Sequence, residues 1–452
     1  MTQTSQVNVR SYALDIIVDV MDKGVYSDKA VHNLLDSGVI ADKRDRAFLT
    51  RLCEGTIERV IEIDYIINQF SKVKVNKMKP VIRGIMRMSV YQLFYMEQVP
   101  DSAVCNEAVK LAVKRKFGNL RGFVNGVLRS VAREKDNIKY PDKKDGFVKY
   151  ASVKYSMPEW IVEKIVKEYS EEQAESLFRQ FVNDDKFTTA RINLSKGTRD
   201  FVTDLLEKDG VTVSKGQFFD YAVRMKNYDK LSDLKAFKEG FIQIQDESSM
   251  VTAAVAAPEK NNIVIDICAA PGGKTLHAAD MLDGMGKVIS GDLTENKTKL
   301  ICENVERLGF KNVEVYVNDA SVFRKEWENT ADIIIADLPC SGLGVIGKKC
   351  DIKYKTKPED IKELANIQKN ILRTVVRYLK PGGRLVFSTC TIVSEENQEN
   401  VKWICEELKL KKENIDERLP EKLRGTTGAD GYIQILPDVS RTDGFFVASF
   451  VK

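Results

Sequence analysis

Five short apolar segments alternate with helical patterns in the second half of the chain, and this alternation restricts the fold more than any other feature. The segments are NIVIDICAA, KVISGDL, VEVYVND, ADIIIADLP and GRLVFSTC. Strands that alternate with helices form a parallel, doubly wound sheet. We therefore expect residues 251–452 to form a Rossmann-like α/β domain, with GYIQIL and GFFVASF forming an antiparallel hairpin on its edge.

The first part of the chain has a different pattern. Residues 1–140 show apolar residues at three- and four-residue spacing, which predicts a helical bundle; the periodic runs are Tyr12–Met21, Ala47–Phe70, Pro80–Met96 and Cys105–Phe117. Residues 134–150 are polar and are expected to be a linker, followed by a helix over 158–181. The segments TTARINL, VTVS and FIQIQ then predict a small α/β module. The expected domains are 1–140, 141–250 and 251–452.

Positive charge is concentrated in the first domain. The whole chain has a formal net charge of +4, and residues 1–140 hold 23 Lys and Arg against 16 Asp and Glu. A basic region of this kind indicates an anionic partner such as RNA. A solvated, Lys-rich helical surface explains the same count.

Several classes of protein are disfavoured by composition. No apolar run approaches the roughly 20 residues that span a bilayer, and the beginning MTQTSQVNVRSYALD lacks the pattern of a secretory signal. We expect a cytoplasmic monomer without a membrane partner. The eight cysteines form no CxxC pair and there are two histidines, so we expect free thiols and no metal site.

A glycine-rich loop follows the first strand of the second half, in the sequence Asp266-Ile-Cys-Ala-Ala-Pro-Gly-Gly-Lys-Thr275. A nucleoside triphosphate loop needs Gly at the position that Cys268 occupies, and the Gly-x-Gly-x-x-Gly pattern of dinucleotide sites is absent. Its small residues nevertheless allow a ligand to approach the backbone. The candidate binding residues of this loop are Cys268, Ala269, Ala270, Pro271, Gly272, Gly273 and Lys274.

Acidic residues stand at the ends of the next two strands. Asp292 ends the second strand, where a carboxylate can bind both hydroxyls of a ribose. Asp319 ends the third, near the expected place of an adenine. A ribose site without a pyrophosphate loop points to S-adenosylmethionine as the cofactor. The alternative is that these aspartates cap the helices that follow them.

Two cysteines follow the fourth and fifth strands, in Asp337-Leu-Pro-Cys-Ser-Gly-Leu-Gly344 and Ser388-Thr-Cys-Thr391. Neighbouring strands lie about 5 Å apart. If these two strands are neighbours, Cys340 and Cys390 face one site beside the methyl donor. The alternative is that each is a buried small apolar residue.

The motifs DICAAPGGKT, DLPCSGLG and STCT resemble those of the RNA cytosine-5 methyltransferases of the NOL1/NOP2/Sun family, and NEAVKLAV and FVNGVLR resemble the NusB-like RNA-binding domain. The resemblance covers nearly the whole chain. It implies an all-α NusB-like bundle, a small α/β module similar to RNA-recognition domains, and a Rossmann-like catalytic domain that uses S-adenosylmethionine. It also implies ribosomal RNA as the substrate, namely 16S RNA free of the assembled subunit.

The resemblance assigns roles that the residues alone leave open. Cys390 matches the nucleophile, and Cys340 matches the cysteine that assists release of the methylated RNA. Residues 268–274, with Asp292, Asp319 and Asp337, match the donor-binding positions. One departure is Gly347-Lys348-Lys349-Cys350, where family members commonly carry Arg.

The chemistry explains why a thiol is needed. A thiolate that adds to carbon 6 of cytosine makes carbon 5 nucleophilic enough to take the methyl group. Asp337 is expected to hold the ring at nitrogen 3 and to supply a proton. Lys274 and the adjacent helix N-terminus are expected to lower the pKa of the attacking thiol.

Two other functions are alternatives. The first is an amino-group methyltransferase, which usually carries Asp/Asn-Pro-Pro-aromatic after the fourth strand. This chain has Leu338-Pro339-Cys340-Ser341 there, which argues against that function. A non-catalytic RNA-binding assembly or antitermination factor would need only the first domain. A transfer RNA or large-subunit RNA target also stays open.

Overall fold

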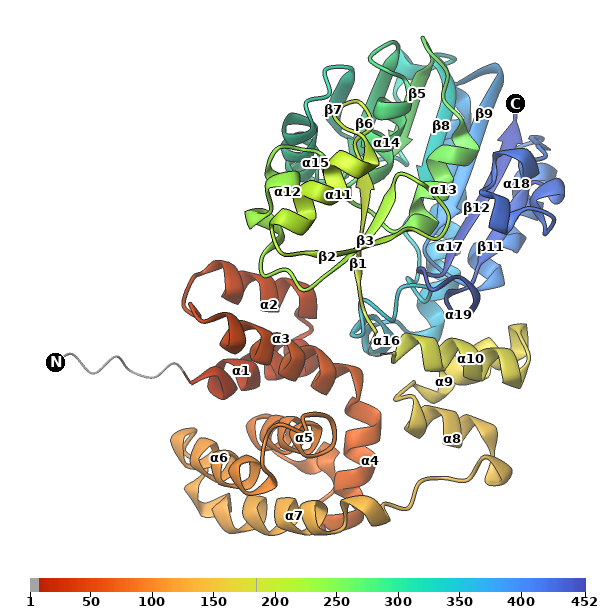
Figure 1. The fold of residues 1–452 in the computed structure, drawn as a ribbon. Helices are drawn as coiled ribbons and strands as arrows, with labels where there is room; N and C mark the ends of the chain where they lie inside the picture. Colours follow the sequence, from red (N-terminus) through yellow and green to blue (C-terminus); the bar gives the residue numbers. More distant parts are fainter. Residues whose placement is uncertain (1–7, 184) are drawn as a thin grey trace. The chain divides into compact units, whose positions relative to one another are not determined.

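The computed structural model describes residues 8–183 and 185–452 (Figure 1). The first seven residues, part of the segment considered above for a secretory signal, lie outside the described residues. The chain divides into two compact units. The helical unit comprises residues up to 182 together with Ile346–Thr356, and the sheet unit comprises residues 183–345 and 357–452.

The helical unit contains α-helices and short 3₁₀ helices (η). They are α1 (Val9–Lys23), α2 (Ser27–Asp36), α3 (Lys43–Glu58), α4 (Val60–Phe70), η1 (Val75–Lys77), α5 (Pro80–Tyr95), α6 (Asp101–Lys114), η2 (Gly118–Leu120), α7 (Arg121–Arg133), η3 (Lys135–Asn137), η4 (Lys143–Asp145), α8 (Phe147–Lys154), α9 (Glu159–Glu168), α10 (Glu171–Phe181) and α16 (Ile352–Lys355). The predicted helical bundle is confirmed. The fold differs in detail from the sequence expectation, because α2 was not predicted and α8 lies partly within the expected linker.

Local sequence explains where these helices begin and end. Asp42 starts α3 by accepting hydrogen bonds from the backbone amides of Arg44 and Asp45. Pro80 occupies the first turn of α5, where its missing amide hydrogen has no cost. The single apolar run over 47–70 folds as two helices, since Arg59 leaves helical geometry between α3 and α4.

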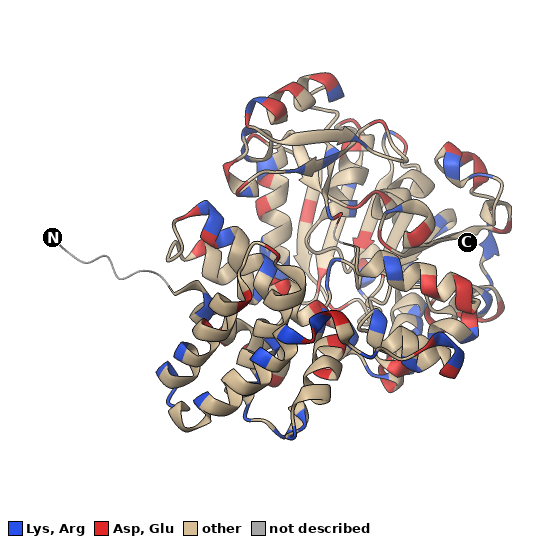
Figure 2. Cartoon of the chain, turned by 60° about the horizontal axis from the view of Figure 1, so that its bottom comes forward, with Lys and Arg blue, Asp and Glu red and all other residues tan. Residues whose placement is uncertain are grey.

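Helix α5 forms the centre of the helical unit. Its residues Ile85, Met86 and Val90 are fully buried, and each such side chain contributes about 1.5–3 kcal/mol relative to exposure. Helix α3 packs closely against it at Gly55, where an added Cβ would lie 2.0 Å from the Tyr91 hydroxyl. Figure 2 shows basic and acidic positions mixed along the helices next to the N-terminus rather than one uninterrupted basic face.

The sheet unit contains the remaining elements. They are β1 (Thr188–Ile192), α11 (Arg199–Lys208), β2 (Thr212–Lys215), β3 (Ala222–Lys226), η5 (Leu231–Asp233), α12 (Lys235–Lys238), β4 (Ile242–Ile244), α13 (Glu247–Ala256), β5 (Ile263–Ile267), α14 (Gly273–Met281), β6 (Lys287–Asp292), α15 (Glu295–Leu308), β7 (Val313–Val317), η6 (Lys325–Trp327), β8 (Ala331–Asp337), α17 (Pro358–Val375), η7 (Val376–Tyr378), β9 (Leu379–Thr389), η8 (Ser394–Glu396), α18 (Gln398–Glu407), β10 (Lys411–Lys412), η9 (Asp416–Arg418), η10 (Glu421–Leu423), η11 (Gly428–Asp430), β11 (Tyr432–Ile435), α19 (Pro437–Ser440) and β12 (Phe445–Val451).

The first sheet of this unit belongs to the small α/β module. Its strand order is β2-β3-β1-β4 and all its pairings are antiparallel. The central strand β3 was not predicted from the sequence. Arg191 of β1, which is almost fully buried, forms an ion pair of 2.8 Å with Asp280 of α14, so the module is bonded directly to the helix that follows the glycine-rich loop.

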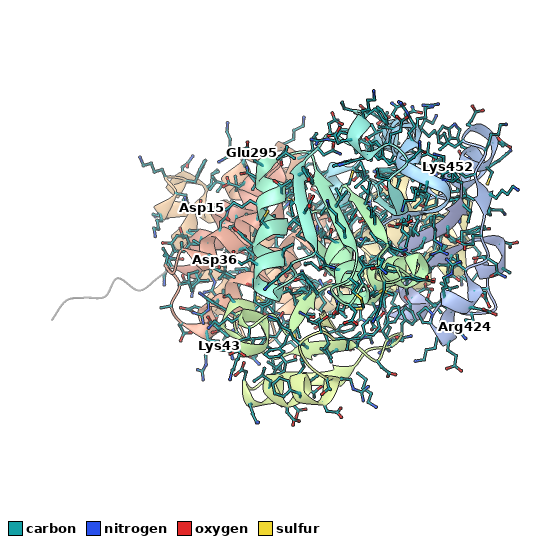
Figure 3. The ribbon with its side chains drawn as sticks, turned by 90° about the horizontal axis from the view of Figure 1, so that it is seen from above. Asp15, Asp36, Lys43, Glu295, Arg424 and Lys452 are labelled. Carbon is teal, nitrogen blue, oxygen red and sulfur yellow. The ribbon has the colours of Figure 1, made fainter. Side chains whose placement is uncertain are left out.

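The second sheet has the order β10-β12-β9-β8-β5-β6-β7, with β11 paired to β12. Strands β5 to β9 are parallel, and β12 runs antiparallel to β9, β10 and β11. The predicted doubly wound sheet and terminal antiparallel pair are therefore confirmed. Figure 3 shows α15, which begins at the labelled Glu295, running beside these strands. Within the described part of the chain, no helix is long and apolar enough to cross a membrane.

Candidate active site

The glycine-rich loop is tightly folded between β5 and α14. Cys268 and Gly272 both have left-handed backbone conformations, with φ of 61° and 102°. The amide of Ala269 donates to the Gly291 carbonyl of the neighbouring strand at 2.9 Å. The loop therefore lies at the carboxyl end of β5, where open α/β sheets bind their ligands.

Asp292, the last residue of β6, fixes this loop. Its carboxylate accepts hydrogen bonds from the amides of Ala270 (2.9 Å) and Leu293 (2.7 Å) and pairs with Lys297. The next side chain, Leu293, is 59% exposed. A carboxylate beside an exposed aliphatic side chain suits a ligand that has both a polar and a flat apolar part.

Negative charge surrounds the loop. Burial, followed by the charges of Asp292, Asp337 and Asp266, raises the pKa of the Cys268 thiol to about 12. Asp266 lies fully buried beneath the loop, accepts a hydrogen bond from Thr275, and has a pKa raised to about 7, chiefly by burial. The carboxylates of Asp292 and Asp337, paired with Lys297 and Lys274, are the charged acidic groups nearest this thiol.

Asp319 lies two residues beyond the end of β7. Its carboxylate accepts hydrogen bonds from the amide (2.9 Å) and hydroxyl (2.6 Å) of Ser321, and these bonds lower its pKa. These bonds close a turn and do not cap a helix, because the next helical segment, η6, begins only at Lys325. Asp292, by contrast, contacts the glycine-rich loop itself.

The structure brings the two predicted cysteines together. Strands β8 and β9 are parallel neighbours with Asp337 paired to Ser388. The loops that follow hold the sulfur atoms of Cys340 and Cys390 3.2 Å apart, and both residues are partly exposed. The cysteines are therefore not separate buried core residues.

The neighbouring Cys390 thiol affects the pKa of Cys340. The hydrogen bond to Cys390, then burial, then the charges of Cys390 and Glu396 raise the pKa of Cys340 well above its ordinary value. Cys340 consequently keeps its proton at neutral pH and can donate it to the sulfur of Cys390.

Lys274 is directed at Asp337 and not at a thiol. Its ammonium lies 2.6 Å from the Asp337 carboxylate, whose other oxygen accepts a hydrogen bond from Ser388 at 2.8 Å. The lysine also lies over the ring of Phe445. Lys274 is therefore placed to orient Asp337, and its expected effect on the attacking thiol stays a prediction.

Sequence reasoning missed several polar residues of this site. Ser388, Thr275 and Asp266 stand inside the quoted motifs but were assigned no role. Glu396 and Asn397, in the sequence SEEN that follows the second cysteine motif, are fully buried beside it. The polar sequence SEEN does not distinguish these two residues from surface residues. Among the residues with described positions, no group of three or more His, Cys, Asp or Glu is arranged to hold a metal ion.

Comparison with known proteins decides the family. Residues 253–451 match the model described as 16S rRNA methyltransferase RsmB/F. The probable ribosomal RNA small subunit methyltransferase B of Bacillus subtilis (strain 168) is 37% identical over 99% of both chains. This chain belongs to the RsmB/F family. It is accordingly an S-adenosylmethionine-dependent methyltransferase of the kind that acts on ribosomal RNA.

The other comparisons agree with this RsmB/F assignment across the whole chain. Residues 7–133 match the NusB family and residues 157–230 match the ferredoxin-like domain of RsmF/B-like methyltransferases. Ribosomal RNA small subunit methyltransferase B of Proteus mirabilis is 31% identical over 98% of this chain and 99% of its own. The crystal structure of PH0851 superposes with a TM-score of 0.81 at 25% identity, over 99% of both chains. The structure of NSun6 from Pyrococcus horikoshii with SFG shares the fold, with a TM-score of 0.57 at 23% identity over 65% of this chain and 98% of that one.

Proposed function

We propose that this RsmB/F protein transfers the methyl group of S-adenosylmethionine to carbon 5 of a cytosine in 16S ribosomal RNA, with Cys390 as the nucleophile. The observation that carries the proposal is the pair of sulfur atoms 3.2 Å apart at the ends of β8 and β9. Methylation of an exocyclic amino group has no use for a thiol. Carbon 5 of cytosine requires one, because the ring must first be activated at carbon 6.

The residues present fit the methyl donor. When bound, S-adenosylmethionine supplies a methyl group on a positively charged sulfonium. We assign its binding to residues 268–274 with Asp292, Asp319 and Asp337. The carboxylates around Cys268 complement the positive charge, and Asp292 and the exposed Leu293 suit a ribose and an adenine. The structure of NSun6 with SFG has the same fold.

The reaction begins with addition of the Cys390 thiolate to carbon 6. Nitrogen 3 would take up a proton from solvent as carbon 6 is attacked, and Asp337, held as a carboxylate by Lys274 and Ser388, would bind that N–H group and stabilise it. Carbon 5 would then take the methyl group as the bond from this methyl group to the sulfonium sulfur breaks, which leaves a neutral thioether. Loss of the carbon-5 proton and cleavage of the bond between Cys390 and carbon 6 release the methylated base and regenerate the thiolate.

We assign the release step to Cys340. Its sulfur lies 3.2 Å from the Cys390 sulfur, so Cys340 stays beside the adduct once Cys390 is bonded to carbon 6 and can assist release of the methylated base.

We also propose functional domains at 1–140, 141–250 and 251–452. The matched family regions at 7–133, 157–230 and 253–451 each lie inside one of these ranges, which supports the division. The N-terminal domain would bind the ribosomal RNA and the last would carry out the chemistry.

The decisive experiment is bisulfite sequencing of ribosomal and transfer RNA from cells with and without this protein, combined with methylation of free 16S RNA by the purified chain. We expect one 5-methylcytosine in 16S RNA to disappear and to be restored in vitro. A methyl group on an exocyclic nitrogen, or loss of the mark from transfer RNA or large-subunit RNA alone, would overturn the proposal.

A further inference from the structure

A buried carboxylate holds the loop that carries Cys340. Glu396, the last residue of η8, is fully buried. One of its oxygens accepts a hydrogen bond from the Ser341 amide at 2.8 Å, and the other accepts one from the Ser341 hydroxyl. On the other side of Cys340, Gln368 of α17 donates to the Pro339 carbonyl at 2.8 Å. The two neighbours of Cys340 are therefore hydrogen-bonded to Glu396 and Gln368, two buried side chains that also contact each other.

The next residue, Asn397, holds the loop that carries Cys390. Its amide oxygen accepts a hydrogen bond from the Thr389 hydroxyl, and its nitrogen donates to the Thr391 carbonyl at 3.1 Å. Asn397 is fully buried as well, and its nitrogen also lies 2.8 Å from Gln434 of β11. Both neighbours of Cys390 are thus bonded to this one side chain.

The two halves form one continuous network. The Ser341 and Thr391 hydroxyls lie 2.8 Å apart, and Asn400 of α18 joins Gln368 to the Glu396 carbonyl. The Ser341 backbone N–H and the Gln368 side-chain NH₂ both donate hydrogen bonds to the Glu396 carboxylate, and neither of these nitrogen groups can accept one. Buried hydrogen-bond networks of this kind restrict their members to few side-chain arrangements.

We infer that Glu396 and Asn397 are positioning residues that set the separation of the two sulfur atoms, with Glu396 holding the Cys340 loop and Asn397 the Cys390 loop. The inference rests on the proposed roles of the two cysteines. Since the two residues are consecutive, one short backbone segment connects both loops. A displacement of about 1 Å between reacting groups costs on the order of 100-fold in rate, so control of this spacing matters to the reaction.

The spacing can be measured without RNA by using phenylarsine oxide, which bonds to two thiols at once and releases water. We expect the reduced full-length protein to bind it through Cys340 and Cys390, so Cys340→Ala and Cys390→Ala each remove the high-affinity site. Glu396→Ala and Asn397→Asp are expected to weaken binding at least tenfold, while Glu396→Gln, which keeps an amide in place of the carboxylate, restores most of it. The exposed Glu399→Ala on α18 is the matched control and should equal the wild type.

S-adenosylmethionine binding of the same variants separates a positioning effect from general damage, because it should stay near the wild-type value, and thermal unfolding shows which variants are folded at the assay temperature. If Glu396→Ala fails to fold, Asn397→Asp, which preserves size, still tests the inference. Unchanged phenylarsine oxide affinity in the folded variants would overturn it.

Methyl transfer to RNA provides the second readout. We expect kcat to fall about 100-fold in Asn397→Asp with little change in KM, as a misplaced reacting pair requires. If phenylarsine oxide binding weakens as expected but methylation does not depend on either cysteine, the positioning inference stands and the proposed function fails. If methylation needs both cysteines while all variants keep wild-type dithiol affinity, the proposed function stands and the inference fails.

Discussion

The sulfur atoms of Cys340 and Cys390 lie 3.2 Å apart although 50 residues separate them in the chain. The closeness follows from the register of β8 and β9, in which Asp337 is paired with Ser388. Each cysteine follows its paired residue by two or three positions, and the backbone of the two loops is joined where the Gly344 amide donates to the Cys390 carbonyl at 3.1 Å. The sheet therefore brings two reactive groups to one point of its carboxyl edge.

Replacing each cysteine by alanine should give two different defects. Cys390→Ala removes the nucleophile, so we expect methyl transfer to fall by at least about 10⁴-fold with donor binding intact. Cys340→Ala removes the group that assists release, so a covalent protein–RNA adduct should accumulate. Denaturing gels with 16S RNA measure the adduct, and calorimetry measures donor binding. An adduct in Cys390→Ala, or none in Cys340→Ala, would contradict the assigned roles.

The ion pair of Lys274 with Asp337 predicts that substitutions of the two residues reduce activity to different degrees. Asp337→Asn keeps the hydrogen bond from Ser388 but loses the charge that would stabilise a protonated ring, and we expect kcat to fall about 10²–10⁴-fold. Lys274→Met leaves Asp337 with one of its two partners, and a smaller loss is expected. The measurement is single-turnover methylation. A larger loss for Lys274→Met than for Asp337→Asn would mean that Lys274 acts on the RNA or a thiol directly.

The parallel sheet, the glycine-rich loop and the cysteine pair could be predicted from the sequence, because each depends on a strong local pattern. Val264 and Ile265 belong to a continuous apolar strand, and a polar or cysteine residue ends or directly follows each parallel strand. Strand β3 was missed since its sequence AVRMK alternates weakly, and it forms only because β1 and β2 pair with it on both sides.

The polar residues around the cysteines could not be predicted. Glu396 and Asn397 look like ordinary surface residues in the sequence, and only the packing of η8 behind the two loops buries them. The ion pair of Lys274 with Asp337 was not predicted either, because which of several nearby anions a lysine pairs with depends on side-chain geometry. Interactions between distant segments carry no local signature.

Asp266 should make stability depend on pH. Its pKa is raised to about 7 by burial, whereas an unfolded aspartate has a pKa near ~3.9. The unfolded chain gives up this proton first, so the free energy of unfolding falls as pH rises from about 4 to about 7, by at most ~1.4 kcal/mol per pH unit. The free energy of unfolding of Asp266→Asn, relative to that of the wild type, should therefore be higher at pH 8 than at pH 5, as measured by denaturant unfolding. The exposed Asp283→Asn should show no such difference between the two pH values.

The segment that departs from the family pattern, Gly347–Cys350, belongs to the helical unit. Cys350 is buried in the core of that unit with its sulfur 3.7 Å from the Glu54 carbonyl. Lys353 is 1% exposed, and its ammonium donates to the Glu58 carbonyl at 2.8 Å. Internal packing therefore constrains Cys350 and the neighbouring Lys353, whereas Lys348 and Lys349 are exposed.

Asp351, which directly follows the Gly347–Cys350 segment, should stabilise helix α2. Its carboxylate accepts hydrogen bonds from the Ser27 amide (3.2 Å) and hydroxyl (2.8 Å) at the first residue of α2, and it pairs with Lys355 at 2.6 Å. No side chain next to α2 in sequence caps this helix, so a residue 324 positions away replaces the usual cap. Asp351→Ala leaves the Ser27 donors and Lys355 without this carboxylate, which costs about 1–3 kcal/mol. Hydrogen exchange over residues 27–36 should accelerate, whereas the exposed Lys349→Ala should leave it unchanged. Equal protection of α2 in both variants would show that Asp351 does not cap the helix.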